Sequence, residues 1–325
     1  MFEPITDINK TKYNVTKIDY PILWGMYKEQ QNFDWKAEEI DFSKDYDDFI
    51  KLEPEVQNII KMILAFFANA DGIVNFNIGS RIMNDITIIE AKMAYQFQIA
   101  IENVHNETYS LMLNTLIKDD DEREYLSNSI TTIPAIKLMT DWALKWINDE
   151  KTTLGERLVA FACVEGIFFS GAFAIIFWLK NYKSKTKTCM KGLVDSNNLI
   201  ARDEALHCKF GCELYKMLNN KLSILKVNEI VNDSVLIAQN FVIETLKCPL
   251  IGINADLMKN YIEHVADHLL VNIGYKKIYY KSNPFKWMDS IGMVQKSNFH
   301  EMRPTEYQSS HKKVEVKQTT AEDDF

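Results

Sequence analysis

A carboxylate, an imidazole and a phenol recur at helical spacing within residues 98–109. Glu102 and His105 are three residues apart, and His105 and Tyr109 are four apart. On a helix these three side chains therefore project from one face. The flanking residues are apolar with the same period, which turns this face toward a protein core. Polar groups placed there need partners, and a carboxylate with an imidazole one turn away is a metal-binding pair.

The same pair occurs a second time about one hundred residues later, as Glu204 and His207. A single Glu-x-x-His arises often by chance, whereas two on long apolar helices favour a shared metal site. Ferritin-like di-metal carboxylate proteins combine two such pairs with one carboxylate from each of two further helices. Asp71 and Glu165 interrupt apolar helical stretches and supply those carboxylates. The predicted ligands of two divalent ions, iron or manganese, are Asp71, Glu102, His105, Glu165, Glu204 and His207.

Low glycine and proline content predicts long helices. The chain of 325 residues contains 11 glycines and 7 prolines, so turns and helix breaks are few. Apolar periodicity predicts helices over 20–33, 86–117, 133–148, 158–179, 194–218, 223–246 and 255–273, and one beginning at Pro54. The acidic stretch 119–127 is expected to be a solvated turn. The predicted fold class is all-α, a ferritin-like helical bundle with a di-metal carboxylate site in its core.

Charge and cysteine content exclude other classes of protein. The formal net charge of −8 provides no basic face for nucleic acid. Five cysteines without a Cys-x-x-Cys pair indicate free thiols in a reducing cytosol, and no signal peptide is visible. Residues 158–179 are long and apolar enough to span a membrane, with Glu165 as their only charge. Because no second such stretch is recognised, we expect a buried central helix and no membrane contact.

Tyr109 makes the metal site more specific, since a phenol beside a di-iron centre that has activated oxygen can be oxidised to a radical. The apolar residues expected around such a radical are Phe169, Phe173 and Ile200. With this tyrosine, the chain resembles the small, radical-generating (beta) subunit of class I ribonucleotide reductase from Trp35 to Phe325. The matching stretches are 65–75, 98–109, 164–171 and 200–207.

The resemblance implies roles that spacing alone does not give. It implies that the six ligands bind two irons, that Tyr109 holds a stable radical, and that Trp35 and Asp203 connect the iron ligand His105 to an electron and proton route. It assigns Tyr307 as a relay tyrosine and the last residues, through Phe325, as the tail that docks on the large subunit. It also implies that the chain forms a homodimer in the cytoplasm. A separate large subunit would use the radical to reduce ribonucleotides to deoxyribonucleotides for DNA synthesis. Manganese in place of iron stays open.

The expected organisation is an N-terminal arm and first helix over 1–34, a di-iron bundle over 35–285, and a flexible C-terminal tail over 286–325. Two alternatives share the bundle. Another ferritin-like oxygen activator, such as a desaturase or oxidase, would not need Tyr109, Trp35 and a tyrosine-bearing tail together. An iron-storage protein would need no radical route. His264 and His268 are also at helical spacing, but a solvated helix face is expected there because no partner motif accompanies them.

Overall fold

The computed structural model describes residues 3–181, 190–247 and 250–288, and these form helices joined by short connections. The predictions for Tyr307, for the tail through Phe325 and for most of 286–325 lie outside the described residues. The main helices are α1 (Pro21–Gln31), α2 (Asp45–Phe49), α3 (Pro54–Asn77), α4 (Met83–Asp85), α5 (Ile89–Leu116), α6 (Asp120–Ser127), α7 (Ser129–Thr132), α8 (Pro134–Asn148), α9 (Leu154–Cys163), α10 (Phe169–Asn181), α11 (Lys191–Met217), α12 (Ile224–Thr245) and α13 (Ala255–Asn272). Two π-helical turns, η4 (Ile78–Ile82) and η5 (Val164–Phe168), interrupt this series, and short 3-10 turns cover Pro4–Thr6, Ile8–Lys10, Ala37–Glu39 and Lys286–Met288.

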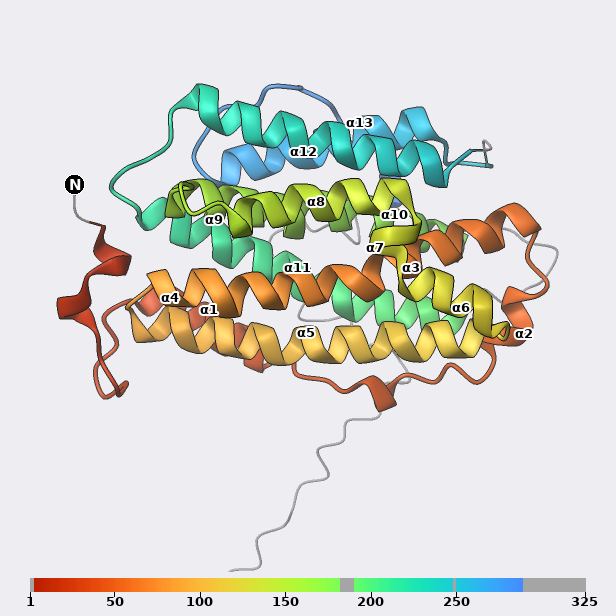
Figure 1. The fold of residues 1–325 in the computed structure, drawn as a ribbon, viewed down its shortest axis with the longest axis horizontal. Coiled ribbons are helices and arrows are strands. Elements are labelled where there is room, and N and C mark those ends of the chain that lie inside the picture. The colour runs from red at the N-terminus through yellow and green to blue at the C-terminus, as the bar shows by residue number, and fades with distance from the viewer. Residues whose placement is uncertain (1–2, 182–189, 248–249, 289–325) are drawn as a thin grey trace, which may run out of the picture.

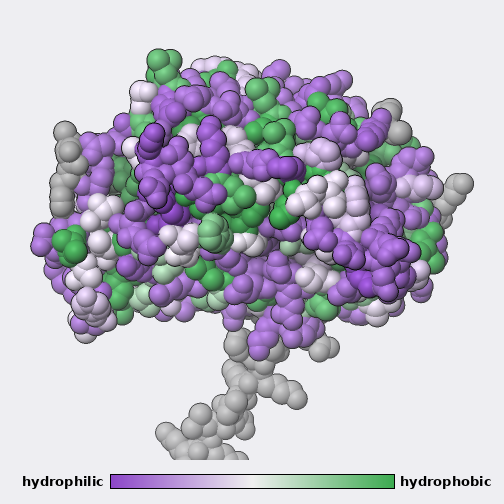
Figure 2. All heavy atoms as spheres, viewed as in Figure 1, coloured by the Kyte–Doolittle hydropathy of each residue, from purple (hydrophilic) through white to green (hydrophobic). Residues whose placement is uncertain are grey.

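The long helices lie roughly side by side in a bundle (Figure 1). Helices α3 and α5 pack against each other on one side, and α12 packs against α13 on the other. Between these pairs lie α8, α9, α10 and α11, so the middle of the molecule is enclosed by helices. On the face shown in Figure 2, hydrophilic side chains predominate and hydrophobic ones lie among them in groups. Burial of the apolar helix faces is the main favourable contribution to such a fold.

The segment Leu154–Lys180 is an interior helix, because 94% of its most apolar window is buried inside the protein. A second segment, Pro54–Asp85, is also long and apolar enough to cross a membrane, and 50% of its most apolar 18-residue stretch is buried. The sequence-based expectation that only one such stretch exists was therefore wrong. The second was missed because Asp71 and the polar residues around it divide the apolar run.

The helix that carries Glu165 is not regular. Its first part, α9, begins with a capping box in which Thr153 N–H donates to Glu156 and the Glu156 N–H donates to Thr153 Oγ1. The chain then widens into the π-helical turn η5 over Val164–Phe168 before α10 continues. Such turns are frequent at functional sites. This one contains Glu165, one of the predicted ligands.

The acidic stretch after α5 is also helical. The acidic composition predicts a turn over 119–127, but Asp120–Ser127 form α6, and the Asp119 side chain accepts the Glu122 N–H at 2.8 Å. The prediction was wrong because three acids near a helix N-terminus are stabilised by the exposed N–H groups there.

The start of α11 is capped by a helix far away in sequence. Asp45 of α2 accepts the Gly192 N–H at 3.0 Å and the Leu193 N–H at 2.7 Å, and Asp48 accepts the Met190 N–H at 3.2 Å. A Cβ on Gly192 would lie 2.6 Å from Phe42 and 2.7 Å from a backbone oxygen. Glycine therefore permits the close approach that lets α2 cap the helix bearing Glu204 and His207.

Asp45→Ala is expected to lower the free energy of unfolding by about 2 kcal/mol, because two buried N–H groups of α11 lose their acceptor. Urea unfolding of the metal-free protein measures this loss. Asp47→Ala in the same short helix is the matched control, because Asp47 is exposed. Equal stability of the two variants would contradict the capping role.

Candidate metal centre

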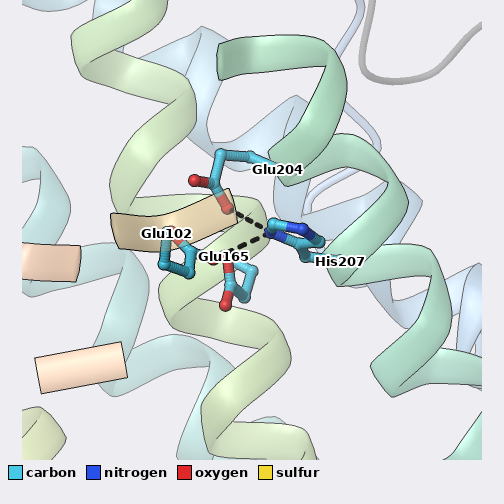
Figure 3. A group of neighbouring side chains, drawn as sticks. All are labelled: Glu102, Glu165, Glu204 and His207. Carbon is cyan, nitrogen blue, oxygen red and sulfur yellow. Dashed lines mark hydrogen bonds and ion pairs between the residues drawn. The ribbon is translucent and has the colours of Figure 1, made fainter. Parts of the chain in front are cut away.

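Three carboxylates and an imidazole meet in the middle of the bundle. Ligand atoms of Glu102, Glu165, Glu204 and His207 all lie within 4.8 Å of one another. Figure 3 shows these side chains converging from three helices, with dashed lines from His207 to two of the carboxylates. Its Nδ1 lies 2.9 Å from Glu102 Oε1 and 3.1 Å from Glu204 Oε2. One donor set for a cation is therefore already assembled.

A second donor set shares Glu102 with the first. Asp71, Glu102 and His105 also have ligand atoms within 4.8 Å of one another. His105 Nδ1 lies 3.2 Å from Glu102 Oε2 and 3.1 Å from Glu204 Oε1, so both Glu-x-x-His pairs face each other. All six side chains are at most 1% exposed. The structure thus brings together every ligand residue predicted from the sequence.

The electrostatics of this cluster favour bound cations. Burial and the neighbouring carboxylates raise the pKa of Asp71 and of Glu165 well above the usual range. Burial acts against the charge on His207, but Glu102 and Glu204 outweigh it and raise the pKa of His207 to about 9. Protons therefore compensate the excess negative charge in the metal-free protein. Two divalent ions would replace those protons.

Some ligand oxygens also lack a hydrogen-bond donor. Among the described residues, Asp71 Oδ2 and Glu165 Oε2 are buried without a hydrogen-bond partner. Buried carboxylate oxygens are costly when unpaired, and a metal ion satisfies them directly. The donor set of carboxylates and imidazoles suits iron or manganese. The residues present fit a two-ion site on both grounds.

Gln98 contacts two of the predicted ligands at once, which the sequence did not reveal. Its side-chain amide donates to Glu102 Oε1 at 3.2 Å and to Glu165 Oε1 at 3.0 Å, and the residue is fully buried. Gln98 lies four residues before Glu102 on the same helix face, which was a usable signal. Its link to Glu165 depends on helix packing and could not be predicted.

Gln98→Met is expected to weaken metal binding by about 10–100-fold, the range typical when a group that orients a ligand is removed. Methionine keeps the length of the side chain but offers no donor to Glu102 or Glu165. Competition with a chelator measures the affinity. Gln96→Met on the exposed face of α5 is the control. Indistinguishable affinities for the two variants would contradict the orienting role.

Tyr109 packs against an aromatic cluster near the predicted ligands. Its ring stacks on Phe67 with a centroid distance of 4.7 Å and an angle of 9°. Phe67 in turn lies 5.0 Å from Phe173 and 5.9 Å from Phe169. Ile200 is buried on α11, one turn before Glu204. Phe67 was missing from the predicted cage, although it precedes Asp71 by one helical turn.

The Tyr109 hydroxyl is held in its neutral form. The side chain is 2% exposed, and burial followed by the charges of Asp71 and Glu204 raises its pKa well above the ordinary value. The apolar rings exclude water from the phenol. This is an environment in which an oxidised phenol would have few groups to react with.

A hydrogen-bonded chain leads from His105, one of the predicted ligands, to an indole. Trp35 Nε1 donates to Asp203 Oδ2 at 2.8 Å, and the same oxygen lies 3.2 Å from His105 Nε2. Asp203 Oδ1 accepts from Arg202 Nη2 at 2.8 Å. Burial acts against ionisation of Asp203, but the Arg202 charge and the hydrogen bonds from His105 and Trp35 lower its pKa. Arg202, which the sequence analysis did not single out, thereby keeps this carboxylate charged.

Comparison with known proteins agrees with this geometry. The profile of the family described as "Ribonucleotide reductase, small chain" matches residues 12–284. The chain belongs to the ribonucleotide reductase small-chain family. It is 49% identical over 306 residues to ribonucleoside-diphosphate reductase subunit M2 of Rattus norvegicus, which covers 94% of this chain and 77% of that protein. The small chain of vaccinia virus (strain Western Reserve) is 48% identical over 306 residues and covers 94% of each chain.

Solved structures support the same family. The chain superposes on the ribonucleotide reductase Rnr4 homodimer from Saccharomyces cerevisiae with a TM-score of 0.78 and 31% identity, covering 87% of this chain and 88% of that one. The predicted all-α ferritin-like fold and the resemblance to a class I ribonucleotide reductase small subunit are thus confirmed. The individual site roles stay predictions, and so does the division at residues 34 and 285.

Proposed function

We propose that this chain is the radical-generating small subunit of a ribonucleoside-diphosphate reductase. In this proposal it stores an oxidising equivalent on Tyr109, and a large subunit uses that equivalent to reduce ribonucleotides to deoxyribonucleotides for DNA synthesis. The observation that carries the proposal is the position of Tyr109, buried against Phe67 and one turn from His105. Family membership and the named relatives support it.

The metal site would hold two iron ions, with manganese as the alternative metal. Asp71 and His105 belong to one donor set, Glu165 and His207 to the other, and Glu102 to both. Two bound irons would supply the chemistry by which oxygen removes one electron and one proton from Tyr109. The chain itself orients the carboxylates through Gln98, keeps the phenol neutral, and excludes water with the cage of Phe67, Phe169, Phe173 and Ile200.

The electron and proton route would run through the hydrogen-bonded chain of Trp35, Asp203 and His105. The charged Asp203 carboxylate orients both the Trp35 N–H and the His105 Nε2. Each of these two contacts gives a proton a defined position next to Asp203. Tyr307 would continue the route, and the tail through Phe325 would dock on the large subunit. We propose that the subunit acts in the cytoplasm as a homodimer. The yeast relative is named a homodimer.

Electron paramagnetic resonance after adding ferrous iron and oxygen to the metal-free protein tests this function. A tyrosyl signal together with two irons per chain is expected. Two bound irons without an organic radical would overturn the proposal. That result would point to a ferritin-like oxidase or an iron-storage protein, which use such a bundle without a stored radical.

A further inference from the structure

Two histidines lie together on α13, outside the buried centre. His264 and His268 are four residues apart, and their rings are in contact with a centroid distance of 4.5 Å and an angle of 68°. Both side chains are half-buried. The spacing of the two histidines predicts a partly solvated helix face, and the structure places their imidazoles edge to face on that face.

A backbone carbonyl determines which nitrogen of the His264 ring is available to a ligand. Its Nδ1 lies 3.0 Å from the backbone carbonyl of Lys281. A carbonyl oxygen only accepts hydrogen bonds, so Nδ1 must carry the proton. The neutral ring then has its free lone pair on Nε2. A histidine that binds a metal through one nitrogen commonly donates the other to a backbone carbonyl, which is the arrangement seen here.

His268 is also suited to act as a neutral ligand. Burial, His264 and Lys277 lower its pKa, and the charge of Asp267 opposes them only in part. At neutral pH the ring therefore carries no charge that would repel a cation. Lys277 would repel a bound ion, and Asp267 would attract it.

The nearby carboxylates are engaged with other groups. Asp267 Oδ1 accepts the N–H groups of Ile278 and Tyr279 at 2.9 Å, and its Oδ2 accepts the Lys281 N–H at 3.3 Å. Glu263 accepts from Gln239 at 3.1 Å. A cation at the two rings would therefore have two protein nitrogens, with water completing its coordination.

We propose that His264 and His268 bind one divalent transition-metal ion of the zinc, nickel and copper class. The two ring centroids lie 4.5 Å apart, which is about the separation of two imidazoles that bind one ion at a metal–nitrogen distance of about 2.1 Å with a nitrogen–metal–nitrogen angle near 90°. Nitrogen ligands favour these metals, whereas the carboxylate-rich centre favours iron or manganese. The two sites would thus select different ions.

Metal binding at this site would also stabilise the segment that follows α13. The His264 ring holds the Lys281 carbonyl, and Asp267 holds three N–H groups of the same segment. An ion that fixes the His264 ring would strengthen its hold on this segment. Metal binding is therefore expected to raise the thermal unfolding temperature of the full chain.

Copper(II) added to the iron-loaded full-length protein tests the site. Paramagnetic resonance should show one copper ion per chain with two nitrogen ligands. Either His264→Gln or His268→Gln should weaken copper binding by about 100-fold, because the advantage of two linked ligands is lost. Circular dichroism of each variant verifies that the fold is retained.

The chain has six histidines, and two of the remaining four belong to the buried centre. His300→Gln combined with His311→Gln is therefore the matched control, and it should leave the two-nitrogen copper signal intact. An unchanged signal in His264→Gln would overturn the inference. Loss of the signal in the His300 and His311 double variant would overturn it as well.

Discussion

Tyr109→Phe is expected to abolish the tyrosyl radical and the reductase activity while two metal ions still bind. The substitution removes only the hydroxyl, so the ring can keep its stack on Phe67 at 4.7 Å. None of the ligand atoms of Asp71, Glu102 or His105 is altered. Paramagnetic resonance measures the radical, metal analysis gives the number of bound ions, and assay with the large subunit gives turnover.

Tyr261→Phe is the matched control for this experiment. Tyr261 is also buried, but it lies on α13 beside Phe285 and away from the predicted ligands. It should retain both the radical and the activity. Full activity in Tyr109→Phe would show that this phenol does not carry the oxidising equivalent. Loss of metal from Tyr109→Phe would instead show that the hydroxyl is needed to build the site.

The ligands could be predicted from sequence because each Glu-x-x-His pair lies within one helical turn. Helix periodicity fixes the direction of Glu102 relative to His105, and of Glu204 relative to His207, without knowledge of the fold. Asp71 and Glu165 could be chosen because a carboxylate in an apolar helix needs a partner. Helical periodicity does not predict which helices pack against each other. The sharing of Glu102 between both donor sets therefore emerged only from the structure.

The groups that support the site were missed for the same reason. Gln98 meets Glu165 across two helices, and Asp45 caps α11 from 147 residues away. Phe67 resembles any other core phenylalanine until α3 is packed against α5. Arg202 precedes Asp203 in the sequence, but adjacency alone does not predict that the two side chains pair. The same guanidinium also donates to the Phe33 carbonyl at 2.9 Å, a contact that depends on tertiary packing. Local spacing predicts ligands, whereas tertiary packing determines what orients them.

Glu102→Ala is expected to empty both metal positions. Glu102 belongs to both donor sets, and its two oxygens lie 2.9 Å from His207 Nδ1 and 3.2 Å from His105 Nδ1. Removing a shared ligand should weaken binding of each ion by more than about 100-fold, beyond the 10–100-fold loss typical of groups that only support a ligand. Metal analysis after dialysis against a chelator measures both losses.

Two further variants make this prediction specific. Glu107→Ala, five residues later on the exposed face of α5, removes the same chemical group and should leave both ions bound. Asp71→Ala affects the donor set of His105 alone, so one ion should be lost more readily than the other. Retention of one tightly bound ion in Glu102→Ala would mean that the two positions do not share this carboxylate. Loss of both ions in Glu102→Ala, with unequal loss in Asp71→Ala, is the pattern expected if Glu102 belongs to both donor sets.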